Sequence, residues 1–158
     1  MSEENIVRVA APADEAEIMN LCLELHSENG QHPVNMEKVR GMVQRCLLQQ
    51  GGIIGVIGEP GDIKGCICIL IDPVWYSDQL QLLELFNFVR PDARQSGSAK
   101  QLILYGKKCA DETGLDLMIG VLSNIRMEGK VRLYGRLLPK AGEFFCYRPS
   151  SPSRSEAA

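Results

Sequence analysis

The chain lacks the short motifs that mark several large classes of enzyme. It contains no Gly-Lys-Ser or Gly-Lys-Thr, no His-Glu-x-x-His and no Gly-x-Ser-x-Gly, which disfavours a P-loop NTPase, a zinc protease or a serine hydrolase. Histidine occurs only twice, and no two cysteines have the Cys-x-x-Cys spacing. Cys22 and His26 are four residues apart on a predicted helix, but two imidazoles are too few for an ordinary structural zinc site. We therefore expect no metal.

Long apolar runs and excess positive charge are also missing. No segment approaches the roughly 20 apolar residues that a membrane span requires. The first residues, Met1-Ser2-Glu3-Glu4, are the reverse of a signal peptide. A net charge of -3 gives no electrostatic case for binding nucleic acid. These features predict a cytoplasmic protein that binds neither nucleic acid nor a membrane.

The composition fits a single folded domain. With 158 residues and 45% hydrophobic residues, the chain can form one core, which we assign to residues 1–149. Residues 150–158 are small and polar, so a disordered tail is expected there. Buried free thiols in a reducing compartment would explain the six cysteines, because most fall on apolar helix faces or inside a strand. They are Cys22, Cys46, Cys66, Cys68, Cys109 and Cys146.

The periodicity of apolar residues predicts alternating strands and helices. Pro12 is expected to open the first helix, and a polar loop is expected over residues 27–35, with Asn35 as the cap of the second helix. The predicted strands cover residues 5–10, 53–57, 63–71, 82–89, 115–122 and 143–147. The later helices are expected over residues 36–50, ended by Gly51-Gly52, over 99–113 and over 127–138. The order is β-α-α-β-β-β-α-β-α-β, which predicts an α/β protein with a mixed sheet.

A short loop between a strand and a helix is the most informative segment. The apolar run 82–89 ends at a proline, and small polar residues lead into the helix that begins near Ala99. The first N–H groups of a helix have no partner within the helix, and the helix dipole adds partial positive charge, so such a loop binds phosphate. The three glycines of a dinucleotide fingerprint are missing, since only Gly97 is present. An ordinary polar turn is the alternative.

The loop fits the pattern Arg/Gln-x-x-Gly-x-Gly/Ala through Arg94, Gly97 and Ala99. This pattern resembles the acetyl-CoA pyrophosphate loop of the GNAT superfamily of N-acetyltransferases. The order of elements is similar to the GNAT order over about residues 5 to 148. The compact size also resembles acetyltransferase-like proteins of bacteriophages. The resemblance implies the GNAT acyl-CoA N-acyltransferase fold, in which the fourth strand carries a bulge and diverges from the fifth to admit the pantetheine arm of acetyl-CoA.

The resemblance also implies which residues contact the cofactor. Backbone groups near Val89 would meet the pantetheine, and the loop would hold the pyrophosphate. Gln95 and Ser98 depart from the usual pattern, since glycine and an aliphatic residue are common at those places. The implied cofactor-binding residues are Phe88, Val89, Arg94, Gln95, Ser96, Gly97, Ser98, Ala99 and, at the end of the fifth strand, Asn124.

Glu84 is the candidate catalytic base. It is the only charged residue in the predicted strand 82–89, and it stands where some GNAT members that act on small molecules carry a catalytic glutamate. A partly buried carboxylate would have a raised pKa, which suits a base near neutrality. Alternatively, Glu84 faces solvent or pairs with an arginine. Simple alternation puts it on the face of Phe86 and Phe88, but the expected bulge could change that.

Tyr134 is the candidate general acid, because Arg132-Leu133-Tyr134 resembles the Leu-Tyr pair in the last GNAT helix. The alternative is a core tyrosine in a stripe with Val131 and Leu138. The acceptor is unidentified, and its pocket would lie over the first two helices and the loop after the third strand. Side chains nominated for that pocket are His26, Glu28, His32, Trp75 and Tyr76.

The leading hypothesis is an N-acetyltransferase that moves the acetyl group of acetyl-CoA to a primary amine of a small molecule or protein. Two alternatives are a transferase for another acyl group and a GNAT-like module without catalysis that serves in binding or structure. GNAT sheets normally end with two strands, whereas residues 140–147 leave room for barely one. Either the sheet is short or a second copy of the chain supplies an edge in a homodimer.

Overall fold

The structure is a computed structural model that describes residues 6–150. Within these residues, one five-stranded sheet has the order β1-β2-β3-β4-β5. Its strands are β1 (Val7–Val9), β2 (Gly52–Glu59), β3 (Asp62–Pro73), β4 (Leu80–Val89) and β5 (Leu117–Met118). The first four strands pair antiparallel, and β5 pairs with β4 in parallel. The α-helices are α1 (Glu15–Asn29), α2 (Met36–Leu47), α3 (Ser98–Thr113) and α4 (Met127–Leu137).

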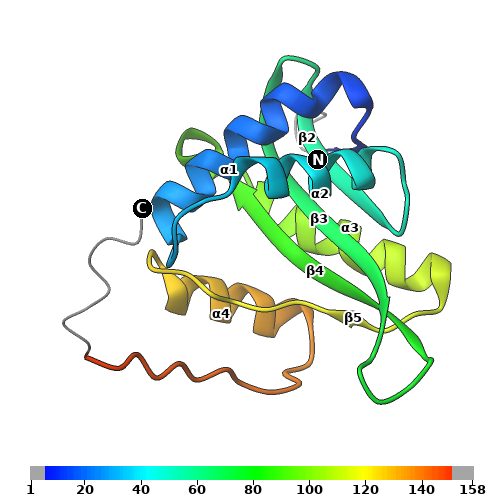
Figure 1. Cartoon of the computed structure of the whole chain (residues 1–158), viewed down its shortest axis with the longest axis vertical. Coiled ribbons are helices and arrows are strands. Elements are labelled where there is room, and N and C mark those ends of the chain that lie inside the picture. The colour runs from blue at the N-terminus through cyan, green and yellow to red at the C-terminus, as the bar shows by residue number, and fades with distance from the viewer. Residues whose placement is uncertain (1–5, 151–158) are drawn as a thin grey trace.

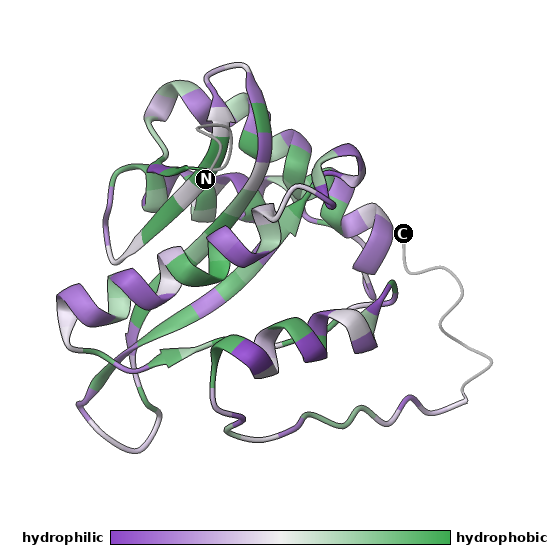
Figure 2. Cartoon of the chain, turned by 180° about the vertical axis from the view of Figure 1, so that it is seen from behind, coloured by the Kyte–Doolittle hydropathy of each residue, from purple (hydrophilic) through white to green (hydrophobic). Residues whose placement is uncertain are grey.

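Helices cover both faces of the sheet (Figure 1). α1 and α2 pack on one face, where Leu21 and Val43 join Ile54 in a buried core. α3 packs on the other face, where Leu102 meets Ile67. Figure 2 shows α3 lying across that second face, with hydrophilic residues along its outer side. The helices therefore bury the apolar faces that their periodicity predicts.

The predicted helix ends are confirmed where a cap residue defines them. The side chain of Asn35 accepts a hydrogen bond from the Lys38 N–H over 3.0 Å and so caps α2. α3 ends at Gly114, whose φ of 69° lies in the left-handed region. Pro12 opens a short 3-10 turn, Pro12–Asp14, that leads into α1. No helix in the described part of the chain is both long and apolar enough to cross a membrane.

Several predicted element boundaries are wrong. α2 ends at Leu47, earlier than the predicted stop at Gly51-Gly52. α1 continues to Asn29, so the loop predicted from residue 27 begins later. Only Leu117–Met118 of the strand predicted for 115–122 pairs with a neighbour. No strand follows α4 within residues 6–150, so the strand predicted for 143–147 is not formed. That segment is extended and exposed, because β5 diverges from β4 and no adjacent strand is available for it to pair with.

The cysteines are free thiols, and four of them are buried, as predicted. Cys46 and Cys68 bring their sulfur atoms within 3.6 Å of each other in the core. Cys109 is partly buried. Cys146 is exposed, so burial does not explain it, because the segment around it does not pack on the sheet. The tail predicted for residues 150–158 lies outside the described residues, apart from Ser150.

Candidate active site

A cavity of about 760 Å³ opens where β4 and β5 diverge. Its walls come from α1, α2 and the loop between them, from β4, β5 and the segment after β5, and from α4 and Phe144. Leu82 and Leu83 of β4 pair with Leu117 and Met118, and beyond them β4 has no strand partner on this side within the described residues. The β4 edge from Glu84 to Asn87 therefore lines the cavity without a strand beside it. This divergence is what the GNAT resemblance predicts.

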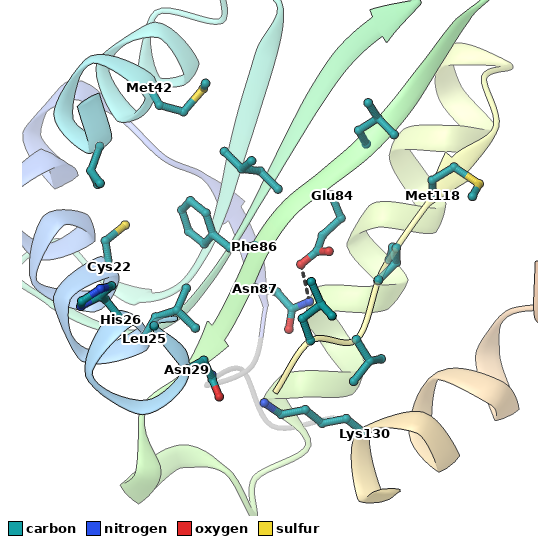
Figure 3. A pocket seen from close by; sticks show the side chains of 18 of the residues that line it. Cys22, Leu25, His26, Asn29, Met42, Glu84, Phe86, Asn87, Met118 and Lys130 are labelled. Carbon is teal, nitrogen blue, oxygen red and sulfur yellow. Dashed lines mark hydrogen bonds between the residues drawn. The ribbon is translucent and has the colours of Figure 1, made fainter. Parts of the chain in front are cut away.

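A bulge in β4 decides which way Glu84 points. Cys68 of β3 lies opposite Phe86, and the next residue, Ile69, lies opposite Glu84, so Leu85 is an extra residue without a partner on β3. A bulge reverses the alternation of side chains between the two faces. In Figure 3, Phe86 points toward α1, whereas Glu84 and Asn87 point toward the gap beside β5. Simple alternation would place Glu84 on the same face of the strand as Phe86 and Phe88. The structure places it on the other face.

Asn87 connects the two candidate catalytic side chains. Its Nδ2 donates a hydrogen bond to Glu84 Oε1 over 2.8 Å. The same amide lies against the Tyr134 hydroxyl, 2.8 Å from Nδ2 and 3.0 Å from Oδ1. Because a carboxylate only accepts hydrogen bonds, Glu84 fixes which end of the amide faces it. Glu84, Asn87 and Tyr134 therefore form one hydrogen-bonded group, which we call the polar triad.

Burial shifts the pKa values of both outer members of the polar triad upward. Burial raises the pKa of Glu84 to about 7, against the opposing effects of the Asn87 hydrogen bond, the Gly120 N–H and the charge of Lys130. Burial likewise raises the pKa of Tyr134 to about 12. At neutral pH, Glu84 can take up or release a proton, and Tyr134 holds its proton. The pair can therefore accept one proton and donate another.

The raised pKa of Glu84 should make the stability of the fold depend on pH. The carboxyl binds its proton more tightly in the folded state, where its pKa is about 7, than at its ordinary value of 4.5. The free energy of unfolding should therefore fall by about 3 kcal/mol as the pH rises between these two values. Glu84→Gln cannot ionise and should remove this slope, which urea unfolding at a series of pH values would measure. Glu37→Gln, exposed on α2, is the control; if it flattened the slope as much as Glu84→Gln, Glu84 would not be its source.

The predicted phosphate loop leads directly into α3. Gly97 precedes the first residue of the helix and has a φ of 83°, a conformation that side chains disfavour. A Cβ built on Gly97 would meet no atom within 4 Å, so the space in front of this turn is open. The N–H groups of the first helical turn have no acceptor within the helix. The loop therefore has the backbone and the space that a phosphate group requires.

The side chain of Arg94 turns away from that loop. Its guanidinium forms two hydrogen bonds with the Glu28 carboxylate, of 2.6 and 2.7 Å, and a third with the Val89 carbonyl, of 3.0 Å. It also stacks over the Phe88 ring, 5.4 Å from its centroid. Arg94 and Glu28 thus join the loop to α1. Phosphate binding by Arg94 would rely on its backbone.

The remaining predicted residues lie in different places. Asn124 bonds to the end of α1, where its N–H donates to Asn29 Oδ1 over 2.9 Å. His26 lines the cavity, and its ring Nε2 lies 2.7 Å from the His32 carbonyl.

Trp75 and Tyr76 are 95% and 74% exposed in the β3–β4 turn and do not line the cavity. Ser96 and Ser98 share a 2.6 Å contact between their hydroxyl oxygens at the start of α3, and Gln95 and Ala99 lie in the same loop.

Asn87 and Lys130 are polar residues of the cavity that were not identified from the sequence. Asn87 is a polar residue in a largely apolar strand, and this contrast is the sequence signal that could have identified it. Lys130 enters the cavity from α4, where its ammonium donates to Ser123 over 2.7 Å. Burial and the charge of Arg94 lower the pKa of Lys130. The charge of Lys130 acts on Glu84 because α4 and β4 both line the cavity. These two elements are far apart in the sequence, so no local pattern reveals the interaction.

Solved structures of acetyltransferases share this architecture. AAC(6')-Iy, solved with the bisubstrate analogue CoA-S-monomethyl-acetylneamine, is 20% identical, with a TM-score of 0.67 over 92% of this chain and 97% of that one. A ribosomal-protein-alanine N-acetyltransferase from Brucella melitensis is 15% identical, with a TM-score of 0.68 over 90% and 96%. An acetyltransferase from Trypanosoma brucei is 19% identical, with a TM-score of 0.65 over 90% and 97%.

No protein-family model matches the sequence, and no curated protein matches it. The likeness is therefore one of three-dimensional structure at low sequence identity, and it covers nearly the whole of each chain. The chain has the fold of the GNAT acetyltransferases, with the bulged fourth strand and the divergent fifth strand that the sequence resemblance implied.

Proposed function

We propose that this protein is an N-acetyltransferase that moves the acetyl group of acetyl-CoA to a primary amine. The observation that carries the proposal is the polar triad, which lines the cavity beside the open edge of β4. A scaffold without catalysis would have no need to bury a carboxyl next to a tyrosine hydroxyl, because burying such groups costs free energy. The structural neighbours, which include AAC(6')-Iy bound to a CoA-acetylneamine bisubstrate analogue and a ribosomal-protein-alanine N-acetyltransferase, support the general reaction.

The residues around the cavity suit acetyl-CoA. The β4 edge from Glu84 to Asn87 has no neighbouring strand on the cavity side, so the amides of pantetheine could complete its hydrogen bonding. The turn at Gly97 and the start of α3 offer N–H groups and open space for the pyrophosphate. Phe88 and Val89 join these two parts of the chain. When bound, acetyl-CoA supplies an activated acetyl thioester and a thiol leaving group.

Glu84 would act on the acceptor. An amine attacks only through its unprotonated form, and a carboxylate with a pKa of about 7 can take the proton that the nitrogen loses. The nitrogen then carries the acetyl group in place of that proton. Burial of Glu84 is thus the physical cause of its suitability as a base near neutral pH.

Tyr134 would donate a proton to the leaving sulfur, so that one proton is taken up by Glu84 and one is released by the hydroxyl. Asn87 Nδ2 lies 2.8 Å from the Tyr134 oxygen and can donate to it once the hydroxyl has lost its proton. In the resting state, Oδ1 of the same amide accepts a hydrogen bond from the Tyr134 hydroxyl over 3.0 Å. Asn87 is therefore a positioning residue that orients both the base and the acid.

Asn87→Ala should move the pH dependence of the reaction to higher pH. Its hydrogen bonds lower the pKa values of Glu84 and of Tyr134, so removing them should raise both. We expect the acidic limb of the kcat/KM profile, which Glu84 sets, to shift upward by roughly one pH unit. Asn20→Ala, exposed on α1, is the matched control. A loss of rate with the acidic limb unmoved would make Asn87 a purely structural residue.

The test of cofactor binding is thermal unfolding with acetyl-CoA, beside free CoA and NADH as comparisons. A ligand at about 100 times its dissociation constant stabilises the folded state by about 2.7 kcal/mol, which raises the Tm of a domain of this size by several degrees. We expect the shift with both CoA compounds and not with NADH. Absence of any shift would remove the basis for catalysis and favour a binding or structural module.

A further inference from the structure

The cavity wall opposite the polar triad is apolar. Leu25 of α1, Val39 and Met42 of α2, and Phe86 of β4 are partly buried on the core and also line the cavity. Phe86 points toward α1 across this wall (Figure 3). Their exposed surface would gain hydrophobic free energy by contact with an apolar group. An acceptor that fills this side of the cavity therefore needs an apolar body.

The charges in the wall fit a single ammonium group. Among residues 6–150, Glu84 is the only carboxylate that lines the cavity, whereas Lys38 and Lys130 both line it with positive charge. One ammonium can approach Glu84. A second ammonium on the same molecule would meet lysines and apolar carbon without an acidic partner, which is unfavourable because an ammonium that loses water contacts needs an acceptor or an opposite charge in exchange.

The volume favours a small acceptor. The same cavity of about 760 Å³ includes the gap between β4 and β5, part of which the pantetheine arm would fill under the proposed function. Ligand cavities for small molecules occupy roughly 300–1,000 Å³. The space that remains beside α1 and α2 is therefore of the size of a small organic molecule.

We infer that the acceptor is a small monoamine with an apolar body, such as an arylalkyl or alkyl amine, and not a polyamine. This inference rests on the proposed N-acetyltransferase function. It assigns the single carboxylate to the reacting amine and the apolar wall to the rest of the acceptor.

The test compares acetyl transfer to phenethylamine and hexylamine with transfer to spermidine, neamine and a short peptide with a free N-terminus. We expect kcat/KM for the two apolar monoamines to exceed that for the other three by about tenfold or more. Preference for spermidine or neamine would overturn the inference, and preference for the peptide would assign a protein acceptor. If no amine is acetylated although acetyl-CoA still raises the Tm, the proposed function itself fails.

Two variants distinguish an effect of the apolar wall on acceptor preference from an effect on the stability of the fold. Met42→Glu adds a second carboxylate beside the cavity and should reduce the preference for phenethylamine over spermidine by about tenfold. Leu48→Ala, at the exposed end of α2 and outside the cavity, should leave that preference unchanged. Folding of each variant is checked through the Tm shift with acetyl-CoA. An unchanged preference in a folded Met42→Glu protein would also contradict the assignment of this wall to the acceptor.

Discussion

Glu84→Gln is expected to lower the rate of acetyl transfer by about 10²–10⁴-fold at neutral pH. Glutamine keeps the size of the side chain and can still bond to Asn87, but it cannot take a proton from the amine. The deficit should shrink at alkaline pH, where more of the acceptor is already unprotonated in solution. Steady-state measurement of thiol release across a pH series, with a fixed amine, gives both results.

The binding of acetyl-CoA should survive Glu84→Gln, because the phosphate loop belongs to other residues. The Tm shift with acetyl-CoA is therefore the internal control, and Glu37→Gln on the exposed side of α2 is the matched variant. A Glu84→Gln protein that transfers acetyl groups at the wild-type rate would show that the raised pKa of this carboxyl has no part in the reaction.

Gly97→Glu should weaken acetyl-CoA binding by on the order of a hundredfold or more. The φ of 83° already costs a side chain about 1–2 kcal/mol. The new carboxylate would also project into the open space before the first turn of α3, where it would repel the phosphate groups. Isothermal titration with acetyl-CoA measures the loss of affinity directly.

Gly114→Glu separates the loss of the ligand site from backbone strain. Gly114 ends the same helix, has a φ of 69° and also has no atom within 4 Å of a Cβ position. The two variants therefore add the same charge to similarly strained backbone at opposite ends of α3. We expect both to lower the Tm, and only Gly97→Glu to lose affinity. Equal affinities for acetyl-CoA in the two variants would contradict a phosphate site at Gly97.

Most of the fold could be predicted because its elements carry local signals. The stripes of α1 and α2 follow helical spacing, Asn35 caps α2, and Gly114 ends α3. The C-terminal part of the chain was predicted less well. β5 is short because its pairing depends on how far it diverges from β4, and residues 143–147 have strand-forming composition without a strand to pair with. Such pairing is a property of the assembled sheet rather than of the segment.

The candidate site likewise contains some residues that could be predicted from the sequence and others that could not. Gly97, Glu84 and Tyr134 could be proposed from motif, composition and resemblance, and the structure brings the last two together. The direction of Glu84 could not be predicted, because the bulge at Leu85 reverses the alternation of the strand. Asn87 could not be identified either, since its partner Tyr134 lies 47 residues away in the sequence. These features depend on long-range geometry.

The most direct test of the account is to incubate the protein with acetyl-CoA and phenethylamine and to follow thiol release and product mass together. The account predicts one N-acetylated amine for each thiol released, with both signals reduced in parallel by Glu84→Gln. Release of thiol without an acetylated amine would contradict transfer to an amine. Tight binding of acetyl-CoA with neither signal, for this amine and the others tested, would contradict catalysis and leave a cofactor-binding module.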